Sequence, residues 1–86
     1  LSFRFGYTIM KTIHTLSAMK VGESATIQAF HVDTGFQYRL NGLGLRIGKT
    51  FELIRRAPFN GPLHLRIGST ELMLRKQDAQ MIEVLM

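Results

Sequence analysis

Two short alternating segments on either side of Gly68 and Ser69 constrain the fold of this chain more than any other feature. Residues 63–67 and 70–74 alternate apolar and polar side chains. A glycine-first pair between such segments is typical of a two-residue β-hairpin turn of type II′. This loop length predicts five opposed pairs: Ile67 with Thr70, Arg66 with Glu71, Leu65 with Leu72, His64 with Met73, and Leu63 with Leu74. The five apolar partners then share one buried face, and an opposite-charge pair lies on the other.

A short helix is predicted over residues 34–43, before the strand that precedes the hairpin. Asp33 or Thr34 can cap its start, because both residue types accept a hydrogen bond from the first free amides of a helix. Three apolar residues recur at helical spacing: Phe36, Leu40 and Leu43. This pattern predicts that one face of the helix packs on the rest of the domain.

Two glycines predict how this helix ends and how the next strand begins. Gly44 suits the left-handed backbone position that ends a helix, and Leu45 is then expected to pack back on the last turn. Gly48 permits the sharp bend into the following strand. The helix is therefore inserted between two strands and joined to the second by a tight connection.

The remaining segments complete a small mainly β domain. Six strands are predicted, near residues 12–16, 23–31, 49–57, 62–67, 70–75 and 81–85, with a single helical turn at 77–80. Short antiparallel strands joined by so tight a turn predict a small closed or partly open barrel. Its predicted core consists of Leu16, Ile27, Leu40, Leu43, Phe51, Leu53, Leu63, Leu65, Leu72, Leu74, Ile82 and Val84. These side chains would fill the interior and leave no room for a cofactor.

The residues disfavour an enzyme and leave metal binding open. The 86 residues can form one modest core but no second domain, and they include no cysteine for a disulfide or a thiolate metal site. The sequence has no Ser/His/Asp or Cys/His arrangement and no glycine-rich phosphate loop. Three histidines, His14, His31 and His64, lack the spacing of a zinc site. We therefore predict no catalytic residues, and the sequence does not say whether the chain binds a metal.

The ordered series of these signals over residues 12–85 resembles the FeoA family, small cytoplasmic proteins associated with the bacterial ferrous iron transporter FeoB. The resemblance is carried by Gly22, Ile27, Arg39-Leu40, Leu43-Gly44-Leu45, Gly48, Ala57-Pro58, Gly61-Pro62, Leu72, Leu74-Arg75, Asp78-Ala79, Ile82 and Val84. It implies a small SH3-like antiparallel barrel with one inserted short α-helix, spanning residues 12–86. It also implies a non-enzymatic accessory protein of ferrous iron uptake that binds the cytoplasmic portion of FeoB, at the inner face of the membrane.

Two functions other than transporter binding are considered: nucleic-acid binding and a metal-responsive regulatory role. The formal net charge is +5, which favours an acidic partner, a nucleic acid or an anionic membrane surface. A nucleic-acid-binding barrel would offer a row of exposed aromatic residues, whereas Phe36 and Phe51 are expected in the core. A metal-responsive domain like that of iron-dependent repressors would need a helix-turn-helix segment before the barrel. We therefore favour the transporter partner, with membrane contact only through it.

A partner-binding surface is predicted on the outer face of the hairpin and at the neighbouring strand connection. Its residues are Arg55, Phe59, Arg66 and Met73. Weak self-association is a further expectation, because an exposed strand edge can pair with a second copy. Residues 1–11 have no clear helical period and no signal-peptide pattern. We interpret them as an upstream extension or expression remnant, with a strand over the alternating aromatic residues as the alternative.

Overall fold

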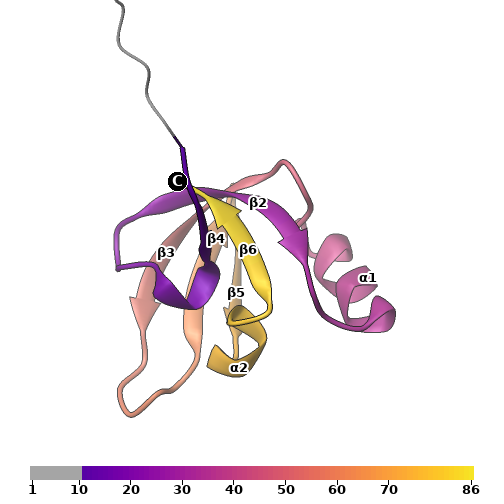
Figure 1. The fold of residues 1–86 in the computed structure, drawn as a ribbon. Helices are drawn as coiled ribbons and strands as arrows, with labels where there is room; N and C mark the ends of the chain where they lie inside the picture. The colour runs from indigo at the N-terminus through magenta and orange to yellow at the C-terminus, as the bar shows by residue number, and fades with distance from the viewer. Residues whose placement is uncertain (1–10) are drawn as a thin grey trace, which may run out of the picture.

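One six-stranded antiparallel sheet, curled into an open barrel, forms the centre of the computed structural model (Figure 1). The structure describes residues 11–86, so the interpretation of residues 1–11 lies almost wholly outside the described residues. The elements are β1 (Ile13–Thr15), the 3₁₀ turn η1 (Leu16–Ala18), β2 (Ser24–Phe30), α1 (Thr34–Gly42), β3 (Thr50–Arg56), β4 (Leu63–Ile67), β5 (Thr70–Leu74), α2 (Lys76–Ala79) and β6 (Ile82–Leu85). The fold is the predicted one: mainly β, SH3-like, with one inserted short helix.

The strand order places β1 and β5 at the two edges of the sheet. Neighbouring strands run β1-β6-β2-β3-β4-β5, and every pair is antiparallel. The helix α1 stands off one side of the sheet, and α2 lies at the end of β5 before the chain returns through β6 (Figure 1). The first predicted strand ends one residue early, because Leu16 belongs to η1 and turns into the core.

The β4–β5 hairpin has the predicted register at all five pairs, from Ile67 opposite Thr70 to Leu63 opposite Leu74. Gly68 has φ +60°, and Ser69 is absent from the residues with positive φ. That combination matches the predicted type II′ turn, which needs a positive φ only at its first central residue.

The start of α1 is fixed by Asp33, the first of the two predicted caps. Its side chain accepts a hydrogen bond from the Phe36 backbone amide at 3.0 Å. This bond satisfies one of the amides that a helix leaves unpaired at its first turn. The other predicted cap, Thr34, is the first residue of the helix itself.

The end of α1 is a Schellman motif, as the glycine pattern predicts. Gly44 has φ +102°, and its amide donates to the Asn41 carbonyl at 3.0 Å. The Leu45 amide donates to the Leu40 carbonyl at 3.0 Å. Both leucine side chains are buried, which is the apolar contact that accompanies this motif.

One predicted core residue is wrong. Leu43 is 50% exposed, whereas Leu45 is fully buried. The helix ends at Gly42 with Leu43 as its C-cap, so the face marked by helical spacing does not continue to Leu43. The chain reverses at Gly44 and brings Leu45 into the core instead.

The other predicted core residues are all buried. Four residues outside the predicted core are buried as well: Met19, Ala25, Leu45 and Ala79. Met19 and Leu45 lie in connections and Ala79 in a short helix, where no strand alternation marks an inward position, whereas Ala25 is a small residue on the inner face of β2. Phe36 packs against the core while remaining partly exposed.

A β-bulge in β3 decides where its last two side chains point. Leu53 pairs with Leu65 and Arg55 pairs with His64, which leaves Ile54 as the extra residue. Simple alternation would place Arg55 on the buried face that Leu53 occupies. The bulge shifts the alternation by one residue and brings Arg55 to the outer face.

The same shift turns Arg56 toward the rim of the barrel. Its guanidinium donates to the Ser17 carbonyl at 2.9 Å and also to the Met19 carbonyl. These two bonds tie the connection between β1 and β2 to the end of β3. Arg56 is therefore a structural residue, although it stands beside Arg55 in the sequence.

Leu65→Asp should lower the free energy of unfolding by about 3 kcal/mol or more, because it places an unpaired charge in the core. Leu65 is fully buried, whereas Met73 on the same hairpin is 59% exposed. The matched control, Met73→Asp, should cost less than about 1 kcal/mol. Urea denaturation of both variants measures the difference. Equal losses in the two variants would contradict the register.

Candidate functional site

Three of the four residues predicted to bind a partner lie on one outer face of the β3–β4–β5 sheet. Two cross-strand rows make up this face: Glu52–Arg66–Glu71 and Arg55–His64–Met73. We call these six residues the outer face. The fourth predicted residue, Phe59, lies in the connection between β3 and β4. The hairpin register and the bulge in β3 together bring Arg55, Arg66 and Met73 together.

The first row holds one guanidinium between two carboxylates. Arg66 Nη2 lies 3.3 Å from Glu71 Oε2, and its Nη1 lies 4.0 Å from Glu52 Oε1. The other oxygen of Glu71 lies 2.8 Å from His64 Nε2. Hydrogen bonds from His64 and then Arg66 lower the pKa of Glu71 below its ordinary value. The charge of Arg66 is thus compensated within the sheet.

The second row carries the unpaired positive charge of the outer face, on Arg55. Arg55 is exposed, and within residues 11–86 it takes part in no ion pair. Met73 in the same row is 59% exposed. A free guanidinium and a flexible thioether on one row suit a surface that meets an acidic and partly apolar partner.

Phe59 is held in solvent by a strained turn. Its side chain is 99% exposed, and its φ of +57° is followed by a φ of +59° at Asn60. A bulky residue in the left-handed region is uncommon and costs conformational energy. One hydrogen bond supports the turn, from Lys76 Nζ to Asn60 Oδ1 at 2.8 Å. The turn also requires glycine at position 61, because an added Cβ would lie 2.7 Å from Ala57 Cβ.

Much of the basic charge in the second half of the sequence is engaged in internal contacts. Arg75 Nε donates to Asp78 Oδ2 at 3.0 Å, and Lys76 and Arg56 have the partners given above. The exposed aromatic residues Tyr38 and Phe59 lie on separate elements, α1 and the β3–β4 connection. They do not form a row on which successive bases could stack.

The histidines of the described chain have scattered partners. His31 Nε2 lies 2.9 Å from Glu83 Oε2, and His14 Nε2 lies 2.5 Å from Thr12 Oγ1. Across residues 11–86, no three His, Asp or Glu side chains are grouped so that they could hold a metal ion. In the same range, none of the helices has the length and apolar character needed to cross a bilayer.

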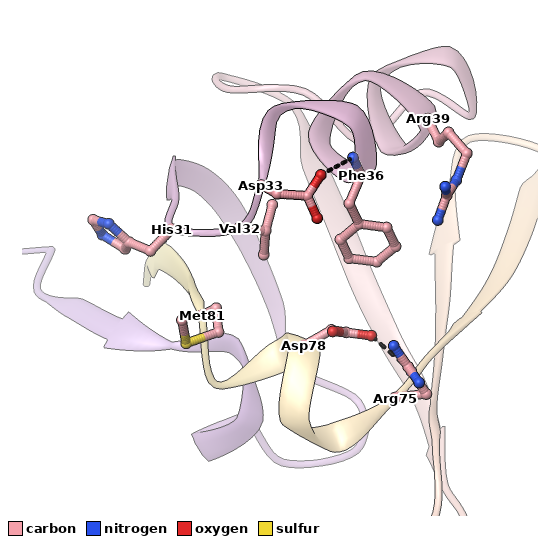
Figure 2. Close-up of a pocket in the computed structure, with 8 residues that line it drawn as sticks. All are labelled: His31, Val32, Asp33, Phe36, Arg39, Arg75, Asp78 and Met81. Carbon is pink, nitrogen blue, oxygen red and sulfur yellow. Dashed lines mark hydrogen bonds and ion pairs between the residues drawn. The ribbon is translucent and has the colours of Figure 1, made fainter.

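A groove between α1 and the β5–α2 segment is a second candidate site, which sequence reasoning missed. Figure 2 shows one lobe of it, of about 330 Å³, lined by His31, Val32, Asp33, Phe36, Arg39, Arg75, Asp78 and Met81. An adjoining lobe of about 290 Å³ shares Phe36, Arg39, Arg75 and Asp78 with it. The walls are far apart in the sequence, so no local sequence pattern indicates the groove.

The FeoA domain family model matches residues 14–86 of this chain. The chain is 33% identical over 69 residues to the Fe(2+) transport protein A/Fe(2+) transporter FeoB fusion protein of Porphyromonas gingivalis (strain ATCC BAA-308 / W83), a match that covers 80% of this chain and 8% of that protein. The chain therefore spans a small part of this relative.

Solved structures share the fold. The solution structure of FeoA protein from Chlorobium tepidum is 28% identical with a TM-score of 0.79, covering 83% of this chain and 68% of the other. A manganese-dependent transcriptional repressor is 21% identical with a TM-score of 0.77, covering 93% of this chain and 45% of the other. The second similarity shows a common fold alone.

The lowered pKa of Glu71 predicts how stability depends on pH. The pKa of Glu71 is lower in the folded state than in the unfolded state, where it is about 4.5. The ionised carboxylate therefore stabilises the fold fully at pH values above 4.5. This contribution is lost as the pH falls through the lowered pKa. The difference in unfolding free energy between wild type and Glu71→Gln should therefore be constant from about pH 6 to 5 and shrink below about pH 4. Urea denaturation at each pH measures it. A difference that grew on acidification would contradict this assignment.

Phe59→Gly should leave the free energy of unfolding unchanged or raise it by up to about 1 kcal/mol, because glycine adopts a positive φ without strain. The side chain of Phe59 is 99% exposed, so little buried contact is lost. Thermal unfolding of wild type and variant gives the comparison. The control is Gly61→Ala, which should destabilise because its methyl group meets Ala57. A marked loss of stability in Phe59→Gly would show that the ring supports the fold.

Proposed function

The chain belongs to the FeoA domain family, and on that premise we propose that it is a non-enzymatic accessory domain of ferrous iron uptake that binds the cytoplasmic portion of an FeoB-type transporter. The observation that carries this proposal is the Porphyromonas relative, whose name joins an Fe(2+) transport protein A and the transporter FeoB in one protein. Fusion keeps two domains at a high effective concentration. It therefore supports association of the same two parts when they are separate chains. The domain then acts in the cytoplasm, next to the membrane.

The interior of the barrel supports a role that depends on its surface. Fifteen buried apolar residues form the core cluster, and within residues 11–86 no polar or charged side chain is buried. Catalytic sites commonly hold polar groups whose burial shifts their pKa. A filled apolar interior suits a domain that presents its outside to a partner.

We assign the contact with the transporter to Arg55, Met73 and Phe59, with Arg66 as a charge-balanced neighbour. Arg55 offers the free positive charge of the outer face, and Phe59 offers a fully exposed ring on a strained turn. Aromatic residues and arginine are enriched among the residues that dominate protein interfaces. The net charge of +5 would favour encounter with an acidic surface of the transporter.

Binding to the purified cytoplasmic portion of the FeoB-type transporter from the same organism tests the proposal. Calorimetry should give a Kd in roughly the micromolar range, as is typical of transient complexes. Arg55→Glu and Phe59→Gly should each weaken binding by about fivefold or more, and the effect of Arg55→Glu should be smaller at high salt. Both variants must keep the circular dichroism spectrum of the wild type.

Lys11→Glu is the matched control, because it reverses an exposed charge two residues before β1, the edge strand at the other end of the strand order from β5. It should bind as the wild type does. No binding by the wild type would overturn the proposed function, and equal binding by all variants would remove the outer face and Phe59 from it. Tighter binding to single-stranded DNA, falling steeply with salt, would favour the nucleic-acid alternative.

A further inference from the structure

The longer wall of the groove is the free edge of β5. Three consecutive residues of β5 line the second lobe: Leu72, Met73 and Leu74. Leu72 and Leu74 are buried on the inner face, whereas Met73 is exposed on the outer face. Successive side chains of a strand point to opposite faces, so a depression that touches all three runs along the strand edge. The strand order confirms that β5 has a neighbour on one side only.

Backbone groups of β5 point into this groove. The Ile67–Thr70 pair that flanks the two-residue turn exchanges hydrogen bonds, and bonded and non-bonded pairs alternate from there. Leu65 and Leu72 therefore form a bonded pair, whereas His64 and Met73 are opposed without bonds. The amide and carbonyl of Met73 consequently face away from β4. Within residues 11–86 they have no backbone partner, so they form a free donor and a free acceptor at the groove wall.

The opposite wall is an apolar strip on α1. Phe36, Leu40 and Leu43 line the second lobe from this side. Leu43 is 50% exposed, so its side chain keeps a large apolar area available beside Met73. An extended chain placed along β5 would have its alternate side chains in contact with this strip.

The lining of the two lobes carries two arginines and two aspartates, so its formal charge is zero. Asp78 accepts from Arg75, with 3.0 Å between Oδ2 and Nε, and Asp33 caps α1. Arg39 lies over the Phe36 ring, with Cζ 5.2 Å from the ring centroid. Within residues 11–86, Arg39 has no carboxylate partner. It is a positioned cation that remains available to an acidic group.

We propose that the groove binds an extended segment of the transporter's cytoplasmic portion, which adds to β5 as a further strand. The segment places an apolar side chain between Leu43 and Met73 and a carboxylate at Arg39. Main-chain bonds to Met73 supply affinity, and the two side-chain contacts supply specificity, as in other cases of strand addition. The proposal rests on the proposed function for the identity of the partner. Met73 belongs to both sites, so the groove continues the outer face.

Amide hydrogen exchange followed by NMR tests strand addition directly. In the free protein the Met73 amide should exchange quickly, whereas the Leu72 amide, paired with β4, should already be protected. Saturation with the purified cytoplasmic portion of the transporter should slow exchange at Met73 by about tenfold or more, with little change at Leu72. The intact chain is used in both measurements.

Charge reversal tests the second contact. Arg39→Glu should weaken calorimetric binding by about fivefold, more at low salt than at high salt. The matched control is Arg46→Glu, at an exposed arginine that lines a separate depression in the α1–β3 connection.

The substitution Met73→Pro tests the strand edge, because it removes the free amide without removing a bond to β4. Its control, Met73→Val, keeps that amide and should retain slow exchange in the complex.

The outcomes separate the two proposals. Binding by the wild type with unchanged exchange at Met73 overturns the groove and leaves the proposed function standing. Absence of any binding by the wild type overturns both. Protection of Met73 that rises with protein concentration and needs no transporter identifies a second copy as the occupant, and it overturns the assignment to the transporter. Equal binding by Arg39→Glu and Arg46→Glu removes the carboxylate contact.

Discussion

The register of the β4–β5 hairpin is the constraint on which the rest of the structure depends. A two-residue turn at Gly68 and Ser69 sets that register, and a slip of one residue would exchange the two faces of the hairpin. The core leucines would then reach solvent, and Arg66 and Glu71 would face the barrel interior. The same register decides which backbone groups of β5 remain free at the sheet edge. Core, outer face and groove thus follow from one turn.

The features that could be predicted from the sequence are those decided by neighbouring residues. The hairpin, the Asp33 cap and the Gly44 helix end each depend on backbone preferences within a few positions, and all three are present. The prediction failed at Leu43, where helical spacing continued past the end of the helix. Spacing does not say where a helix stops, and the reversal at Gly44 exchanged the expected positions of Leu43 and Leu45.

The site depends on features that local patterns do not contain. No residue type marks the bulge at Ile54, yet it decides that Arg55 faces outward and that Arg56 binds the carbonyls of Ser17 and Met19. Charge counting has the same limit. The basic second half of the sequence suggested a positive patch, but Arg66 and Arg75 are paired with carboxylates across or along the fold. The groove joins residues from α1 and β5 that only the tertiary structure brings together.

An open strand edge is a hazard for a small barrel, because it can pair with a second copy. Two features of this domain work against self-pairing at β5. Residues of α1 form the opposite wall of the depression along this edge, and a single extended segment fits between two walls more easily than another folded barrel does. The net charge of +5 makes two copies repel each other and attracts an acidic chain. Arg39 in the same groove has no carboxylate partner within residues 11–86, so a carboxylate of the occupant can pair with it. This local attraction and the repulsion between two copies together produce specificity.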